Sequence, residues 1–156
     1  MAVCPVFAWG KTYIVKNPGT AIITLSSNTI KTAEGLIKKG DIERAKQLLT
    51  DMPQPKDETS EIERMFLLGK IAQKQDDYDT AISLFQKIVN LRPNYAMARY
   101  ELALCYIHNE QWSRADYHLR LAMAGSGLSD ETKQKMMEDL YYVRKNKNWD
   151  VKFRLG

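Results

Sequence analysis

A sequence repeat with a period of about 34 residues constrains the fold of this chain more than any other feature. Ala81 and Ala115 lie one such period apart, and each is followed one helical turn later by a large apolar residue, Phe85 or Leu119. Around the first pair, the segment 78–91 places its apolar residues at i, i+3, i+4 and i+7, which is the spacing of a helix and not of a strand. A small residue followed by a large one, repeated at this period, predicts a stack of paired helices.

Further positions of the same period make the pattern resemble the tetratricopeptide repeat. In that family a large and a small residue follow each other on the first helix of each pair, and Leu68 with Gly69 and Leu102 with Ala103 occupy these positions here. The small residue lets the two helices of one pair approach closely. Pro93 ends the segment 78–91, because proline cannot continue a helix.

The resemblance implies an all-α fold, namely a right-handed superhelix of three helix pairs with a capping helix at its C-terminal end. We expect the repeat domain to span residues 26–147. The helix predictions within it are 26–39, 42–51, a pair that begins at residue 62 and includes 78–91, a third pair, and a capping helix over 130–147.

The capping helix carries signals at both of its ends. Ser129 is the predicted N-cap, acidic residues follow it in the first turn, and basic residues lie in the last turn, as the helix dipole favours. Five apolar side chains of this helix are expected to cover the last repeat. They are Met136, Met137, Leu140, Tyr141 and Val143.

The two ends of the chain lie outside the repeat. Residues 1–25 form an N-terminal extension whose first ten residues are apolar, with small residues near their end, but lack the charged start of a secretory signal. The alternatives are a signal remnant or a short hairpin around the turn at 17–19. Apolar and polar residues alternate over 148–156, which predicts an extended tail, as if a β-structure began there.

Composition indicates a globular protein, and the missing motifs argue against catalysis. Hydrophobic residues make up 44% of the chain, charged residues 27%, and the net charge is +4, which is typical of a globular protein with a solvated helical surface. Metalloprotease, nucleophile-elbow and phosphate-loop motifs are missing from the sequence. Cys105 and His108 share a helical face, yet a buried free thiol and a groove histidine are favoured over a catalytic pair. We therefore predict a chain that is not an enzyme and uses no cofactor or metal.

Recognition of a protein remains as the expected activity. The tetratricopeptide resemblance implies that positions two, five, nine and twelve of each repeat line a concave groove. In the second and third repeats these positions are Glu63, Phe66, Lys70, Gln73, Met97, Tyr100, Leu104 and Ile107, which we call the candidate groove. Phe66 and Tyr100 hold the same position and are expected side by side as aromatic anchors. The alternative is that the capping helix or the N-terminal segment covers these residues.

A second resemblance covers residues 28–156. The stretch ARYELA at 98–103 and the junction at Trp149 resemble the N-terminal part of surface lipoprotein assembly modifiers. That family implies a periplasmic tetratricopeptide domain, associated with the outer membrane, followed by a β-barrel in the full-length protein. It also implies an exported lipoprotein as the protein or peptide ligand, with no nucleic acid and no small-molecule substrate. The alternative is a self-contained cytoplasmic tetratricopeptide adaptor.

Overall fold

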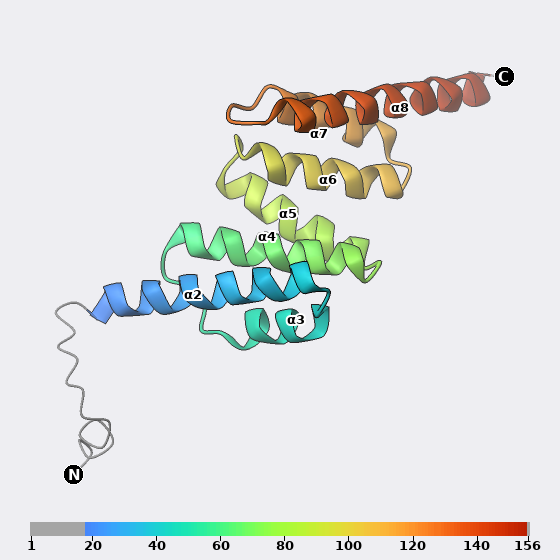
Figure 1. Cartoon of the computed structure of the whole chain (residues 1–156). Coiled ribbons are helices and arrows are strands. Elements are labelled where there is room, and N and C mark those ends of the chain that lie inside the picture. The colour runs from blue at the N-terminus through green and yellow to red at the C-terminus, as the bar shows by residue number, and fades with distance from the viewer. Residues whose placement is uncertain (1–17, 156) are drawn as a thin grey trace, which may run out of the picture.

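The protein folds as a stack of α-helices, shown in Figure 1. The computed structural model describes the backbone of residues 18–155 and the side chains of residues 25–148. The helices are α2 (Pro18–Lys39), α3 (Ile42–Asp51), α4 (Glu58–Lys74), α5 (Tyr78–Leu91), α6 (Ala96–His108), α7 (Trp112–Met123) and α8 (Asp130–Leu155). None of the described helices combines the length and the apolar character needed to cross a membrane.

Helices adjacent in sequence pack against each other. The pairs are α2 with α3, α4 with α5, and α6 with α7, while α8 packs on α7 and lies at the end of the stack farthest from α3 (Figure 1). This arrangement confirms the predicted all-α fold of three helix pairs and a capping helix.

The predicted hairpin in the N-terminal extension is wrong over the part that the structure describes. Residues 18–25 belong to α2, which begins eight residues before the predicted start at Ser26. A proline is compatible with the first turn of a helix, because the N–H that it lacks would have no partner there. Pro18 therefore begins a helix instead of turning a hairpin. Residues 1–17, with the signal alternative, lie outside the described residues.

The predicted extended tail is also wrong. The backbone of α8 continues helically to Leu155, through the alternating segment 148–156 apart from its last residue. A strand at this place would need a neighbouring strand for its backbone hydrogen bonds, whereas extending an existing helix adds one local hydrogen bond per residue. The alternation of four apolar residues with polar ones is therefore not enough to favour a strand over a longer helix.

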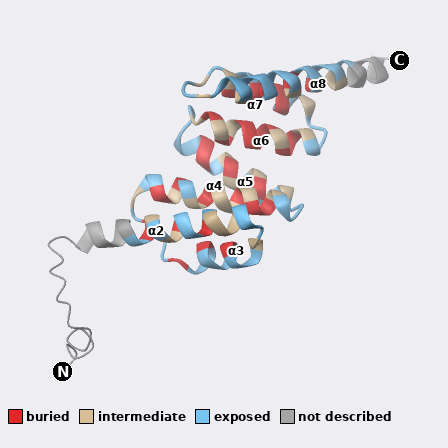
Figure 2. Cartoon of the chain, viewed as in Figure 1, coloured by how far each residue is buried: buried red, intermediate tan, exposed pale blue. Residues whose placement is uncertain are grey.

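The core consists of two clusters of buried residues that share α4. Figure 2 shows the buried residues distributed along the stack of helices. The smaller cluster lies between α2, α3 and α4 and includes Ile30, Ala45, Leu49 and Ile71. The larger cluster extends from α4 to α8 and includes Phe85, which is the largest of the fully buried side chains in the described part of the chain.

The close approach of α4 and α5 depends on Gly69. A Cβ atom at this position would lie 2.7 Å from two ring atoms of Phe85. Real side-chain atoms do not approach this closely, so even alanine would displace the ring. The structure therefore confirms the predicted role of Gly69 in this helix pair.

The turns inside the helix pairs require a left-handed residue. Gly40 has φ 86° in the first pair, and the corresponding residues of the next two pairs are Asp76 with φ 58° and Glu110 with φ 57°. A residue with a Cβ atom is strained in this conformation, less so for Asp than for Glu, whereas glycine is not.

We expect Glu110→Gly to stabilise the fold by about 0.5–1 kcal/mol, because relief of strain exceeds the greater chain entropy of glycine in the unfolded state. Urea denaturation followed by circular dichroism measures this change. Gly40→Ala, which introduces the same strain, is the matched control and should destabilise the fold. A loss of stability in Glu110→Gly would contradict the argument.

Candidate functional site

The eight residues of the candidate groove lie on α4 and α6, the first helices of the second and third pairs. Glu63 is exposed and Tyr100 is buried. The other six are half-buried, namely Phe66, Lys70, Gln73, Met97, Leu104 and Ile107. The structure therefore leaves seven of the eight accessible to some degree.

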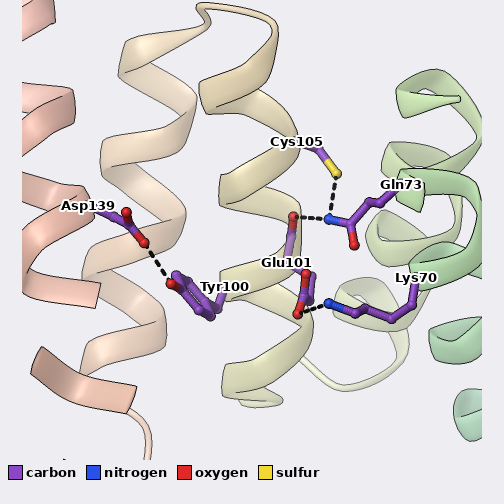
Figure 3. A network of polar contacts seen from close by, with 6 residues as sticks. All are labelled: Lys70, Gln73, Tyr100, Glu101, Cys105 and Asp139. Atoms are coloured by element: carbon purple, nitrogen blue, oxygen red, sulfur yellow. Dashed lines mark hydrogen bonds and ion pairs between the residues drawn. The ribbon is translucent and has the colours of Figure 1, made fainter. Parts of the chain in front are cut away.

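Tyr100 is covered by the capping helix. Its side chain is only 5% exposed, and its hydroxyl donates a hydrogen bond of 2.6 Å to Oδ2 of Asp139 on α8 (Figure 3). Burial, and next the acceptor Asp139, raises the pKa of Tyr100 above its ordinary value. Tyr100 thus joins α6 to α8 and is not an exposed anchor. At this one position the capping helix covers the candidate groove, which was the alternative prediction.

Phe66 packs elsewhere than predicted. Its ring meets the ring of Phe85 edge-on with centroids 5.7 Å apart, and it lies 5.9 Å from the ring of Tyr95. The expected pair of Phe66 and Tyr100 is therefore replaced by contacts with the core and with the start of α6. One side of Phe66 remains accessible to solvent.

Lys70 bridges α4 and α6. Its Nζ atom donates to Oε1 of Glu101 at 2.8 Å, and Glu101 is 5% exposed (Figure 3). The second carboxylate oxygen, Oε2, has no hydrogen-bond partner among the described residues. A buried carboxylate with a single cationic partner is costly to leave unpaired. The side chain of Lys70 is therefore held in one orientation.

Gln73 forms a second bridge between the same helices. Its Nε2 atom donates to the backbone oxygen of Glu101 at 3.4 Å and to Sγ of Cys105 at 3.3 Å (Figure 3). Burial raises the pKa of Cys105 to about 11, so this thiol is protonated at neutral pH. His108 stacks on Tyr78, with ring centroids 3.7 Å apart. The prediction of a buried free thiol at Cys105 is confirmed.

The accessible part of the candidate groove is largely apolar. Phe66, Met97, Leu104 and Ile107 all pack against the larger core cluster and are partly exposed. A pocket of about 590 Å³ lies at the N-terminal end of α4 and includes Glu63 of the candidate groove. It is lined by Thr59, Ile62, Glu63, Leu91, Arg92, Pro93, Asn94 and Tyr95.

Sequence reasoning missed a second pocket, of about 470 Å³, between α2 and α3. Leu25 and Leu48 line it and are 63% and 37% exposed. The helical periodicity of α3 predicts that Ala45, Leu48 and Leu49 all face the core. Ala45 and Leu49 are buried as predicted, and only Leu48 is exposed.

Sequence reasoning also missed the polar bridges between repeats. Lys70 and Glu101 are separated by slightly less than one repeat period, so they lie on α4 and α6, the first helices of two successive pairs. Asp116 on α7 similarly accepts hydrogen bonds from Arg120 and from Arg144 on α8. Opposite charges separated by nearly one period are the signal that would have identified the first of these bridges.

Comparisons with known proteins agree with this geometry. Residues 72–122 match the family model of the tetratricopeptide repeat. The P58(IPK) TPR domain superimposes with a TM-score of 0.71 and 16% identity, over 83% of this chain and 36% of that chain. This chain therefore spans about a third of that structure. The search of curated protein sequences found no match to the present chain.

Two further solved structures come from a bacterial secretion system. The type III secretion translocator chaperone SycD of Yersinia enterocolitica has a TM-score of 0.69 and 17% identity, over 78% of this chain and 85% of that chain. The same chaperone in complex with a peptide of the translocator YopD has a TM-score of 0.67 and 17% identity, over 78% and 93%. At such identities the shared property is the fold. Residues 72–122 thus match the tetratricopeptide repeat, and the chain as a whole shares the fold of these helical-repeat structures.

Proposed function

We propose that this chain is a non-enzymatic scaffold that binds a segment of a partner protein along α4 and α6. One observation carries the proposal: apolar side chains of these two helices, Phe66, Met97, Leu104 and Ile107, stay partly exposed on top of a closed core. Apolar side chains that remain accessible in one region are typical of surfaces that bind proteins. A partner segment with apolar anchors would bury them.

The bridges between helices support the proposal, because they hold this surface in one arrangement. Lys70 with Glu101 and Gln73 with Cys105 fix α6 relative to α4, and Tyr100 with Asp139 fixes α8 relative to α6 (Figure 3). A surface that is already ordered loses little conformational entropy on binding, so more of the contact energy appears as affinity. In this interpretation Lys70, Gln73 and Tyr100 support the site more than they contact the partner.

The solved chaperone complex supports the kind of ligand. SycD shares this fold over 78% of the present chain, and its structure with a YopD peptide shows that a solenoid of this size takes a peptide. We accordingly infer a peptide segment, and not a folded surface, as the first ligand to test.

The narrower proposal concerns the identity of the partner. The resemblance over residues 28–156 favours an exported lipoprotein, bound by a periplasmic domain of an outer-membrane lipoprotein assembly modifier. The second candidate is a cytoplasmic adaptor, which would bind apolar peptides without regard to export.

The test is a titration by fluorescence anisotropy with two sets of labelled peptides that carry apolar anchors, one from exported lipoproteins and one from proteins that are not lipoproteins. Each peptide has a version whose apolar anchors are changed to serine. We expect Met97→Ser with Leu104→Ser to weaken binding at least tenfold, since anchors in an interface commonly contribute about 2 kcal/mol each. The matched control is Tyr117→Ser with Leu121→Ser on α7. It removes two exposed apolar side chains elsewhere and should bind as the unaltered chain does.

Three outcomes separate the proposals. Unchanged affinity in the folded Met97 and Leu104 variant would contradict the placement of the site. Binding that depends on apolar anchors but not on lipoprotein origin would support the scaffold and contradict the lipoprotein partner. Failure of the unaltered chain to bind any of these peptides would contradict both.

A further inference from the structure

The outer face of α8 carries exposed apolar side chains that were expected in the core. Met136, Leu140 and Val143 are buried as predicted, whereas Met137 is 60% exposed and Tyr141 is 72% exposed. These two residues lie one helical turn apart on the same side of the helix, and we call them the α8 stripe. Tyr142, which is 51% exposed, lies beside it.

The repeat period explains why the α8 stripe is uncovered. Met137 lies one repeat period after Ala103 and two periods after Gly69, both of which are buried. At Gly69 the covering group is Phe85 of the following helix, α5. In the described part of the chain, α8 is followed by no such helix, and it lies at the end of the stack (Figure 1). The α8 stripe is thus the place where a further helix would continue the stack.

The charges that border the α8 stripe indicate which helix fits there. Glu131, Glu138 and Lys145 are spaced seven residues apart, so they lie along one side of the stripe, and all three are exposed. When two copies of α8 lie antiparallel about a twofold axis near Glu138, Met137 of each faces Tyr141 of the other. Glu131 of each copy then faces Lys145 of the other. The pattern is complementary to itself in this antiparallel orientation.

We propose that the α8 stripe is a dimer interface, occupied by α8 of a second copy in antiparallel orientation. A twofold interface of this kind uses the same patch on both copies, as these charges require. The two helix dipoles oppose each other favourably as well. One contact is unfavourable, because the two Glu138 side chains approach near the axis. In the monomer, Gln134 donates to Glu138 at 3.3 Å and draws its carboxylate along its own helix.

The first experiment measures the mass of the full chain by size-exclusion chromatography with light scattering over a concentration series. We expect the mass to rise from 18.0 kDa toward twice that value as concentration increases. Met137→Ser with Tyr141→Ser should remain monomeric. Leu91→Ser, which removes an exposed apolar side chain from α5, is the control and should dimerise normally. A monomeric unaltered chain, or a dimer that persists in the double variant, would overturn the proposal.

A charge exchange tests the antiparallel orientation. Glu131→Lys and Lys145→Glu each place like charges at both symmetric contacts, so each alone should weaken dimerisation by roughly tenfold or more. Mixed together, the two variants restore both ion pairs in a heterodimer, which should form as readily as the unaltered dimer. Glu138→Gln removes the repulsion at the axis and should strengthen dimerisation several-fold. A mixture that stays monomeric, or a Glu138→Gln variant that dimerises more weakly, would overturn the antiparallel arrangement.

Discussion

Replacing Phe85 with alanine is expected to destabilise the fold by about 3–5 kcal/mol, the usual cost of truncating a buried aromatic side chain. Phe85 is completely buried in the larger cluster. Its ring fills the space above Gly69 and meets the ring of Phe66. Truncation would leave a cavity between α4 and α5, because Gly69 has no side chain that could fill the space. Urea denaturation followed by circular dichroism measures the loss.

The control for this variant is Leu91→Ala on the same helix, because Leu91 is 51% exposed. Its free energy of unfolding should change little. Equal stabilities for the two variants would reject the assignment of Phe85 to the centre of the repeat. In a short solenoid the loss also weakens the adjoining repeats, since stability is a sum of repeats and the interfaces between them.

Acidification should destabilise the fold through His118. This side chain is 7% exposed, and its Nδ1 atom lies 3.2 Å from Nη1 of Arg99. Burial, followed by the positive charges of Arg99 and Arg114, lowers the pKa of His118 to about 4. In the unfolded chain the imidazole takes up a proton near its ordinary pKa of 6.5. Between pH 6.5 and 4 the unfolded state therefore binds the proton more readily, and the free energy of unfolding falls as the pH falls.

The size of this loss follows from the two pKa values. It amounts to about 3 kcal/mol when the pH reaches 4. Urea denaturation at a series of pH values measures it. The carboxyl groups of the native chain contribute their own dependence, chiefly at lower pH, so the comparison is made with His118→Asn. This variant keeps an acceptor near Arg99 but does not titrate, and its stability should fall less steeply between pH 6.5 and 4. Parallel curves for the two chains would contradict the assignment.

The helices were predictable because the signals for them are local. The bounds of α3 and α5 agree with the prediction, and Ser129 accepts the hydrogen bond of an N-cap from the backbone N–H of Thr132 at 3.2 Å. Spacing along one helix and the residues at its ends decide such features. The predicted tail failed for the same reason, because alternation of apolar residues is evidence for a strand only where a partner strand exists.

The site was less predictable because its accessibility depends on other helices. Position five of the repeat is half-exposed in Phe66 and buried in Tyr100, although the two residues are equivalent in sequence. The difference arises from Asp139, which lies 39 residues after Tyr100 on the capping helix. Likewise, Met136 and Met137 are neighbours of the same type, and only the packing of α8 on α7 decides that the first is buried and the second exposed. Periodicity identifies an apolar helix but not which neighbours will cover each side.

The position of α4 in both core clusters affects which part of the chain unfolds locally first. The cluster between α2, α3 and α4 contains six buried residues, of which α4 supplies Ile71, whereas the cluster from α4 to α8 contains nineteen. Local unfolding follows the amount of buried apolar contact, so the two ends of the stack should differ in the free energy needed to expose their backbone amides. We expect the first helix pair to open while the rest stays folded, because α4 is also packed in the larger cluster with Phe85. The backbone amides of α2 and α3 should therefore exchange their hydrogens with solvent sooner than those of α4 to α8.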